Sequence, residues 1–569
     1  MFILGLILNV FCSEFDYIVV GSGPGGGTVA TELAIKGFKT LLIEAGSDHW
    51  KPNQFTPGLH ATAALDPETS FGFDVKHSLN NVSYFYPRAG ALGGCIVHNA
   101  MLSIYPNTRD FELMHNTTGD EEWLEKNMRN YFKRMEGNQY IENRKDHLHG
   151  FDGWFKTSYL VPPEERSFQF TTLVAATIGD PQFDINGKDS IGLNSDKEAK
   201  SFIPQAVDKS TFTRTNFPAY MRSVAKTHPL TIWTDTFVTR VLFNATTAVG
   251  VEYKKGKYLY KASPLSTNHN NATLGSVMAN KETIISGGTF NTPQILMLSG
   301  IGDKEHLEEF NISVVSHVPG VGRNMMDRYE IPVVLQYPSQ FDSIKKCQLK
   351  ASEDDPCYAE YMEHHTGPYT SNGAISGQLK KSNPKLKEAD LFILDSLSDF
   401  HGYFRGYNQN LVKRCDSSTR LILKAHTNNT NGHVKLLSSN PFDVPDIHFH
   451  YFSDGDSDLD ILVESLKAER ENLSKLNITH TELYPGKAIQ TDDQLRDYIK
   501  ETAWGHHACC TAKMGTSHDP DAVVDAKFRV RGVKNLRVVD MSIFPKIPGY
   551  FPTLYIHMMA MKAADDITS

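Results

Sequence analysis

A strand, a glycine-rich turn, a helix and a second strand ending in an acid constrain this chain's fold more than any other feature. Phe15–Val20 (FDYIVV) is apolar and β-branched, as a buried strand requires, and the turn GSGPGG follows it directly. Thr28–Ile35 then has helical spacing, and a second strand over Lys39–Ile43 ends at Glu44. This order is typical of a dinucleotide-binding α/β unit.

Each residue of this unit has a physical task in binding a dinucleotide. Gly21 permits the tight turn, Gly23 lets the backbone approach a pyrophosphate, and Gly26 lets the helix pack closely on the strand. The helix N-terminus offers unpaired N–H groups and a positive dipole to the pyrophosphate. Glu44 is placed to bind ribose hydroxyls. The motif alone does not separate FAD from NAD.

Length and charge exclude other classes of protein. The 569 residues correspond to three or four domains at about 150 residues each. Lys and Arg number 57 against 66 Asp and Glu, so the net charge of −9 argues against a nucleic-acid partner. Hydrophobic residues at 40% and charged residues at 22% describe a globular protein and exclude disorder of the whole chain.

The N-terminus and the sequons favour secretion. Residues 1–13 contain an apolar run, far shorter than a transmembrane span, that resembles a signal-peptide core without a positive n-region. We therefore expect a secreted glycoprotein, with a soluble intracellular protein as the alternative. The glycosylation sequons are Asn81, Asn116, Asn244, Asn271, Asn311, Asn428, Asn472 and Asn477.

The seven cysteines show no zinc-site spacing. Cys347 and Cys357 could close a small loop, whereas the neighbours Cys509 and Cys510 are expected to be poorly placed to bridge each other.

Six sequence blocks together resemble the glucose–methanol–choline (GMC) family of FAD-dependent oxidoreductases, and the resemblance runs from Phe15 to Ile567. The first block is the GSGPGG turn. The other five are Arg88–Gly94 (RAGALGG), Gly288–Gly302 (GTFNTPQILMLSGIG), Gly320–Asp327 (GVGRNMMD), His507–Gly515 (HACCTAKMG) and Leu536–Pro545 (LRVVDMSIFP).

The resemblance implies an α/β fold with two domains. A Rossmann-type FAD-binding domain would be assembled from residues 14–160, 200–325 and 500–569. An α+β substrate-binding domain, built on a six-stranded antiparallel sheet, would come from residues 161–199 and 326–499. The flavin would face a pocket that the second domain covers.

The resemblance also implies which residues hold FAD. Gly21, Ser22, Gly23 and Gly26 would bind the pyrophosphate, Glu44 the adenosine ribose and Val238 the adenine. Gly93, Asn99, Ala100 and Met101 would line the flavin, with Asp540 and Met541 at the ribityl–pyrophosphate end. His98 stands where choline oxidases have a histidine joined covalently to the flavin 8-methyl carbon, so the FAD is expected to be attached through His98.

The catalytic residue implied by the resemblance is His507, because histidine suits removal of a hydroxyl proton near neutral pH. His506 is expected to support it. The family's second histidine or asparagine falls at Phe551, whose ring can neither donate nor accept such a hydrogen bond. Tyr550, Thr553, Tyr555 or His557 could serve instead.

We therefore predict an FAD-dependent oxidoreductase acting on the CH–OH group of an alcohol, with hydride transfer to flavin N5 and His507 as base. Expected partners are a small alcohol and oxygen or another electron acceptor. The alternative is a non-redox or light-driven flavoprotein of the same fold, of the hydroxynitrile lyase or fatty-acid photodecarboxylase type. No metal is expected at His364–His365 or at His506–His507, because adjacent histidines on a regular element point apart.

Overall fold

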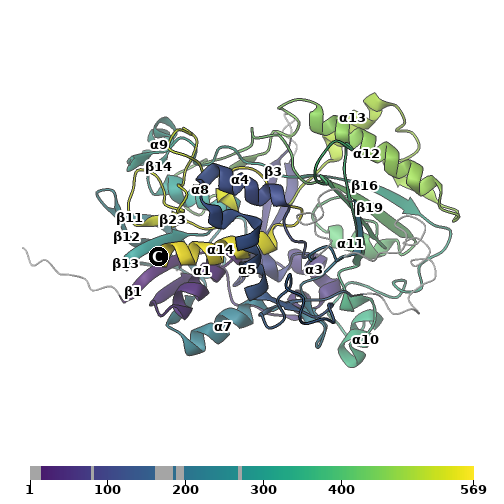
Figure 1. Ribbon diagram of the computed structural model, residues 1–569, viewed down its shortest axis with the longest axis horizontal. Coiled ribbons are helices and arrows are strands. Elements are labelled where there is room, and N and C mark those ends of the chain that lie inside the picture. The colour runs from purple at the N-terminus through teal and green to yellow at the C-terminus, as the bar shows by residue number, and fades with distance from the viewer. Residues whose placement is uncertain (1–13, 78–82, 161–183, 188–197, 267–271) are drawn as a thin grey trace, which may run out of the picture.

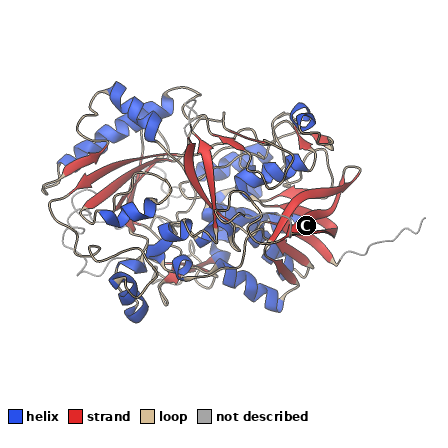
Figure 2. Ribbon diagram, turned by 180° about the vertical axis from the view of Figure 1, so that it is seen from behind, coloured by secondary structure: helices blue, strands red, loops and turns tan. Residues whose placement is uncertain are grey.

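The computed structural model describes residues 14–77, 83–160, 184–187, 198–266 and 272–569. Its strands gather into three larger sheets, which appear in Figure 2 as red groups at the left, centre and right of the molecule. The sheet that carries β1 (Phe15–Val20), β11 (Thr236–Asn244), β12 (Thr247–Lys255) and β13 (Thr273–Ile285) lies at one end of the long axis. The sheet of β16 (Tyr329–Gln336) and β19 (Ser417–Lys424) lies at the other (Figure 1). The predicted pair of sheet-based units is confirmed.

The first sheet has the strand order β10-β2-β1-β13-β12-β11, with β23 added beside β13. The first strand, β1 (Phe15–Val20), pairs in parallel with β2 (Thr40–Ile43) and with β13 (Thr273–Ile285). Both neighbours and the covering helices bury β1, which explains its continuous apolar sequence. β10 (Leu230–Trp233) and β23 (Leu536–Val538) extend the parallel part, so segments distant in sequence build one domain.

Two helices lie side by side against this sheet. α1 (Pro24–Ile35) begins with proline at its first turn, where a missing N–H costs no hydrogen bond. It packs against the C-terminal helix α14 (Thr553–Thr568), which is buried over most of its length (Figure 1). The start of α14 is thereby fixed next to the glycine-rich turn.

The second large sheet has the order β22-β16-β19-β18-β17-β7, and all of its pairs are antiparallel. It is the six-stranded antiparallel sheet that the sequence predicts. Its bounds are β7 Ala199–Phe202, β16 Tyr329–Gln336, β17 Ala374–Lys380, β18 Leu391–Ser396, β19 Ser417–Lys424 and β22 Thr481–Tyr484. α12 (Ser457–Ser474) and α13 (Asp492–Thr502) cover its outer side (Figure 1).

A four-stranded sheet, β20-β21-β3-β4, lies between the two. Its strands are β3 (Ser70–Lys76), β4 (Ser83–Ala89), β20 (His433–Lys435) and β21 (Asp446–His448). β4 leads directly into the RAGALGG block, so this sheet connects the substrate half of the chain with the predicted flavin-binding segment.

Two disulfides are present among the described residues. Cys347 and Cys357 are bonded, as their spacing allowed. Cys509 and Cys510 are bonded as well, so the expectation that these neighbours are poorly placed to bridge each other is wrong. Cys510 has a φ of +81°, and this left-handed turn of the chain brings the two side chains to the same side.

Candidate active site

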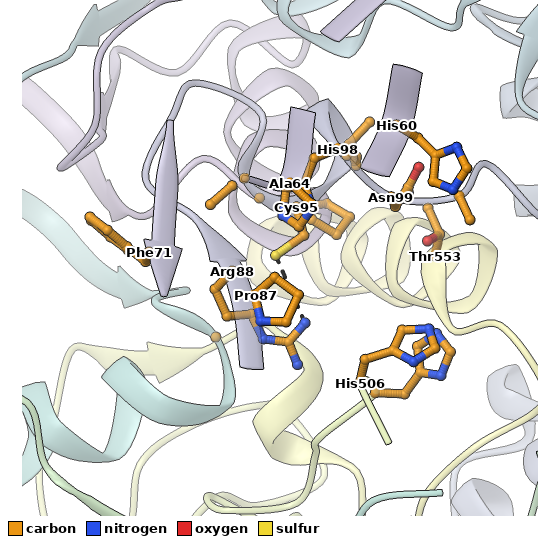
Figure 3. A pocket seen from close by; sticks show the side chains of 18 of the residues that line it. His60, Ala64, Phe71, Pro87, Arg88, Cys95, His98, Asn99, His506 and Thr553 are labelled. Atoms are coloured by element: carbon orange, nitrogen blue, oxygen red, sulfur yellow. Dashed lines mark hydrogen bonds between the residues drawn. The ribbon is translucent and has the colours of Figure 1, made fainter. Parts of the chain in front are cut away.

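A cavity of about 470 Å³ lies between the first sheet and the substrate sheet. Its lining comes from the glycine-rich turn, the segment after β4, the start of α8 (Gly288–Leu298), the loop before Ala508 and the start of α14. Side chains from several of these segments point into one space, among them His98, Asn99, His506 and Thr553 (Figure 3). Most of the predicted site residues therefore meet in one place.

The turn after β1 forms one end of the cavity. Gly21 has a φ of +96°, and a Cβ there would lie 2.3 Å from the carbonyl oxygen of Ser286, so only glycine fits. A Cβ on Gly23, at the N-terminus of α1, would meet nothing within 4 Å. The open approach to Gly23 and the free helix N-terminus fit a pyrophosphate. Gly26 does not line the cavity but packs on the carbonyl oxygen of Gly21.

Glu44 connects the turn to the neighbouring wall. Its Oε2 accepts hydrogen bonds from the Ser22 amide at 3.0 Å and the Ser22 hydroxyl at 2.6 Å, and its Oε1 accepts one from the Gly46 amide. Ser22 and Glu44 both line the cavity with Val238 of β11 (Thr236–Asn244). Gly93 lies outside the cavity lining, where its amide donates to the Ser22 hydroxyl.

The segment after β4 is held by one buried arginine. Arg214 donates from Nη1 to the side-chain Oδ1 of Asn99 at 2.6 Å and to its carbonyl oxygen at 2.7 Å. The amide of Met101 donates to the same Oδ1, and Met101 has a φ of 60°. These bonds fix Asn99, Ala100 and Met101 along the cavity wall, as predicted for a flavin-lining segment.

Asp540 binds two elements together at the cavity edge. Its Oδ2 accepts from the Gly288 amide at the start of α8 and from the Thr292 hydroxyl, while its Oδ1 accepts from Ser542. Asp540 and Met541 both line the cavity.

His98 is a buried histidine without a protein partner on one nitrogen. Its Nε2 makes no hydrogen bond, although the ring lines the cavity. Burial, with the nearby charges of Arg214 and Arg88, lowers the pKa of His98 to about 3. The ring is therefore neutral near pH 7, with a lone pair available to a bound group.

His507 is positioned by the two residues that come just before β16. Asp327 accepts a hydrogen bond from the His507 amide at 2.9 Å, and the Arg328 guanidinium donates from Nε to His507 Nδ1 at 3.1 Å. Burial and the charges of His506, Arg328 and Arg88 hold the pKa of His507 well below its usual range. Sequence reasoning assigned no role to Arg328, although a charged residue just before an apolar strand was a usable signal.

His506 faces a second buried carboxylate that sequence reasoning also missed. Its Nδ1 lies 3.1 Å from Oε1 of Glu330 without hydrogen-bond geometry, so this contact is electrostatic, while Oε2 of Glu330 accepts from the Trp504 indole at 3.1 Å. The His506 and His507 rings lie 4.0 Å apart, centroid to centroid. The expectation that these neighbours point apart is wrong, because they lie in an irregular loop rather than on a regular element.

Phe551, which the resemblance puts in the slot of the family's second polar residue, lines the cavity with its ring edge-on to His507 at 5.8 Å. Of the alternatives, Tyr550 donates to the Ala389 carbonyl, Tyr555 to the Asp110 carbonyl, and His557 is hydrogen-bonded to Thr28. Thr553 is the member of that group that lines the cavity.

The wall opposite the glycine-rich turn is largely apolar. It is formed by strands of the substrate sheet and by the segment that follows β18. The residues are Leu394, Leu397, Phe400, Tyr403, Leu421 and Leu423.

Comparison with known proteins decides the family. The model described as GMC oxidoreductase matches residues 15–330 with its N-terminal part and 428–560 with its C-terminal part. The chain belongs to the GMC oxidoreductase family. It is an FAD-dependent oxidoreductase that acts on alcohols, and the residues at the nucleotide end of the cavity fit that cofactor.

Known proteins align with this chain over almost its whole length. It is 30% identical to the glucose-methanol-choline family oxidoreductase mfmG of Annulohypoxylon moriforme, over 97% of this chain and 94% of that protein. It is 28% identical to the mitochondrial choline dehydrogenase of Mus musculus, over 99% and 90% of the two chains. A formate oxidase from Aspergillus oryzae RIB40 superposes with a TM-score of 0.82 at 20% identity, covering 97% of this chain and 98% of that one.

Among the described residues, no helix has the length and apolarity needed to cross a bilayer.

Proposed function

We propose that this GMC oxidoreductase oxidises a primary alcohol whose substituent is apolar or aromatic. The observation that carries the proposal is the pair His506 and His507, which faces an apolar wall across one cavity. An apolar or aromatic substituent would bury its surface there, because Leu394, Leu421 and Phe400 offer no hydrogen bonds to a polar one.

His507 supplies a hydrogen-bond donor to the alcohol oxygen. The Arg328 guanidinium can only donate, so Nδ1 of His507 must accept, and the proton of the neutral ring is on Nε2. Burial lowers the pKa of His507, so this neutral form prevails near pH 7. An Nε2–H donor stabilises negative charge on the oxygen as the hydroxyl proton leaves, and it takes the place of the donor that Phe551 lacks.

His506 supplies the base. The Glu330 carboxylate near Nδ1 of His506 favours a proton on that nitrogen, which leaves the Nε2 lone pair to accept the hydroxyl proton. The resemblance implies that His507 is the base; our proposal divides the two tasks between the histidines because Nδ1 of His507 accepts from Arg328. FAD, when bound, supplies the acceptor for the hydride of the carbinol carbon.

Anaerobic mixing of the holoprotein with primary aliphatic, aromatic and amino alcohols tests the proposal. Bleaching of the visible flavin band by aliphatic or aromatic alcohols is the expected result, and the speed of recovery in air separates an oxidase from a dehydrogenase. A folded yellow protein that stayed oxidised with all of these alcohols, or that bleached only with amino alcohols, would count against it.

We further propose that His98 is joined to the flavin 8-methyl carbon. The neutral ring with an unpartnered Nε2 in the cavity supports this link. Acid precipitation of the wild-type protein is then expected to give a yellow pellet, and His98→Ala a white pellet with yellow supernatant. His60→Ala, which alters another cavity histidine, is the control and should keep the pellet yellow. Free flavin from the wild type would refute the link.

We also propose that the protein is secreted and glycosylated. The disulfide Cys347–Cys357 is typical of an oxidising compartment, and sequons such as Asn116, Asn244 and Asn311 are exposed. Expression in a eukaryotic secretory host should give medium-borne protein whose gel mobility increases after deglycosylation. Protein retained in the cells without such a shift would contradict the proposal.

A further inference from the structure

Three histidines on the four-stranded sheet bring their ring nitrogens together, away from the active-site cavity. His433 lies on β20, His448 on β21, and His450 follows two residues after His448. One nitrogen from each ring lies within 4.8 Å of the others. None of the three lines the cavity of the candidate active site.

One pair of these ring nitrogens has the spacing of two ligands on one metal ion. His450 Nε2 lies 3.3 Å from His433 Nδ1. A tetrahedral zinc ion with bonds of about 2.0–2.1 Å holds two nitrogen ligands about 3.3 Å apart. A nitrogen of the His448 ring lies within 4.8 Å of both, and the ring, now stacked on that of His450, supplies the third ligand by turning toward the ion.

A carboxylate orients the first histidine. Asp446 Oδ2 lies 3.2 Å from His433 Nε2, and its Oδ1 accepts from Lys76 at 2.8 Å. A proton on Nε2 that faces Asp446 leaves the Nδ1 lone pair for the ion. Carboxylates bound to the outer nitrogen of a ligating histidine are the usual support of zinc sites.

We propose that His433, His448 and His450 bind one divalent transition-metal ion, with Zn²⁺ the best fit. Imidazole ligands suit zinc, copper and nickel, whereas magnesium and calcium prefer oxygen. The His433 side chain is 19% exposed, so an ion has access from solvent. The ion ties β20 to β21 and to the segment after it, and water fills the fourth position of its tetrahedron.

A second cluster of side chains could in principle hold a metal ion and has to be distinguished from this one. Glu330, His506 and His507 also converge. There, however, the Arg328 guanidinium occupies Nδ1 of His507 and places a positive charge beside any cation. We therefore assign the metal to the four-stranded sheet.

Calorimetric titration of the EDTA-treated holoprotein with ZnCl2, and separately with MgCl2, tests the proposal. One equivalent of Zn²⁺ should bind and raise the thermal midpoint, and Mg²⁺ should do neither. His450→Gln should weaken Zn²⁺ binding at least tenfold, and Asp446→Asn about 10- to 100-fold. His518→Gln, an exposed histidine, and His506→Gln, in the other cluster, should bind as the wild type does.

The wild-type titration alone can overturn the proposal, even if a variant fails to fold. Absence of stoichiometric Zn²⁺ binding would overturn it. Loss of binding in His506→Gln, together with retention in His450→Gln, would move the metal to the other cluster. Neither result depends on turnover, so the outcome is independent of the proposed alcohol oxidation.

Discussion

Replacing either His506 or His507 by alanine is expected to lower the activity greatly. Replacing them by glutamine is expected to restore part of the activity at position 507 and none at position 506. His506→Ala should lower kcat by about 10²- to 10⁴-fold, because a general base contributes that much. His507→Ala should lower it by about 10²- to 10³-fold, as removal of one positioned donor does. Steady-state kinetics with the best alcohol of the panel measure both.

The glutamine variants separate the two roles. A glutamine amide can donate a hydrogen bond but is not a base. His507→Gln should therefore recover about tenfold in kcat over His507→Ala, whereas His506→Gln should be as slow as His506→Ala. His401→Gln, which changes a histidine outside the cavity, is the matched control and should keep wild-type kcat.

The opposite pattern would assign the base to His507. It would consist of near-normal turnover in His506→Gln together with equal losses in His507→Gln and His507→Ala. FAD content and the visible spectrum of each variant show whether a loss of kcat comes from chemistry or from a missing cofactor.

The nucleotide end of the site could be predicted because its requirements are local. The φ of Gly21 and the approach to Gly23 follow from a short turn between a strand and a helix. Even here, the sequence did not distinguish the residues that line the cavity from those that pack behind it. Gly26 and Gly93 support the turn through contacts with Gly21 and Ser22, outside the cavity.

The catalytic end could be predicted only in part, because its contacts join distant segments. His507 and the Phe551 slot followed from motifs. The partners of the histidines are Arg328, just before β16, and Glu330, near the start of that strand, and no spacing rule connects them with residues 506 and 507. The histidines of the four-stranded sheet were missed for the same reason, since strand pairing brings His433 opposite His448.

Arg328 both stabilises the backbone around the candidate active site and orients one of its histidines. The guanidinium is fully buried and donates to the carbonyl oxygens of Ala425, Pro548 and Gly549, as well as to His507 Nδ1. Burial lowers its pKa to about 10, so it remains charged at neutral pH. One side chain thus fixes the turn before Phe551 and the ring that faces the substrate.

Arg328→Met is expected to destabilise the protein by about 3–5 kcal/mol, because it leaves the buried carbonyl oxygens of Ala425, Pro548 and Gly549 without their donor and removes the positive charge near Asp327. Thermal or denaturant unfolding measures the loss. The matched control is Arg323→Met in the sequence block just before Arg328, where a half-exposed ion pair with Asp303 is removed. Its expected effect is about 0–1 kcal/mol.

The same substitution should change the pH at which the His507 ring takes up a proton. A purely structural role of Arg328 would leave that pH unchanged. The guanidinium is one of the charges that lower the pKa of His507, so its removal raises that pKa. The ring then becomes protonated at a higher pH than in the wild type, and an NMR titration of the His507 imidazole should show this upward shift. Arg328→Lys keeps a positive charge and should shift the His507 pKa less. A variant with lower stability and an unmoved His507 titration would leave Arg328 as a support of the 548–549 turn alone.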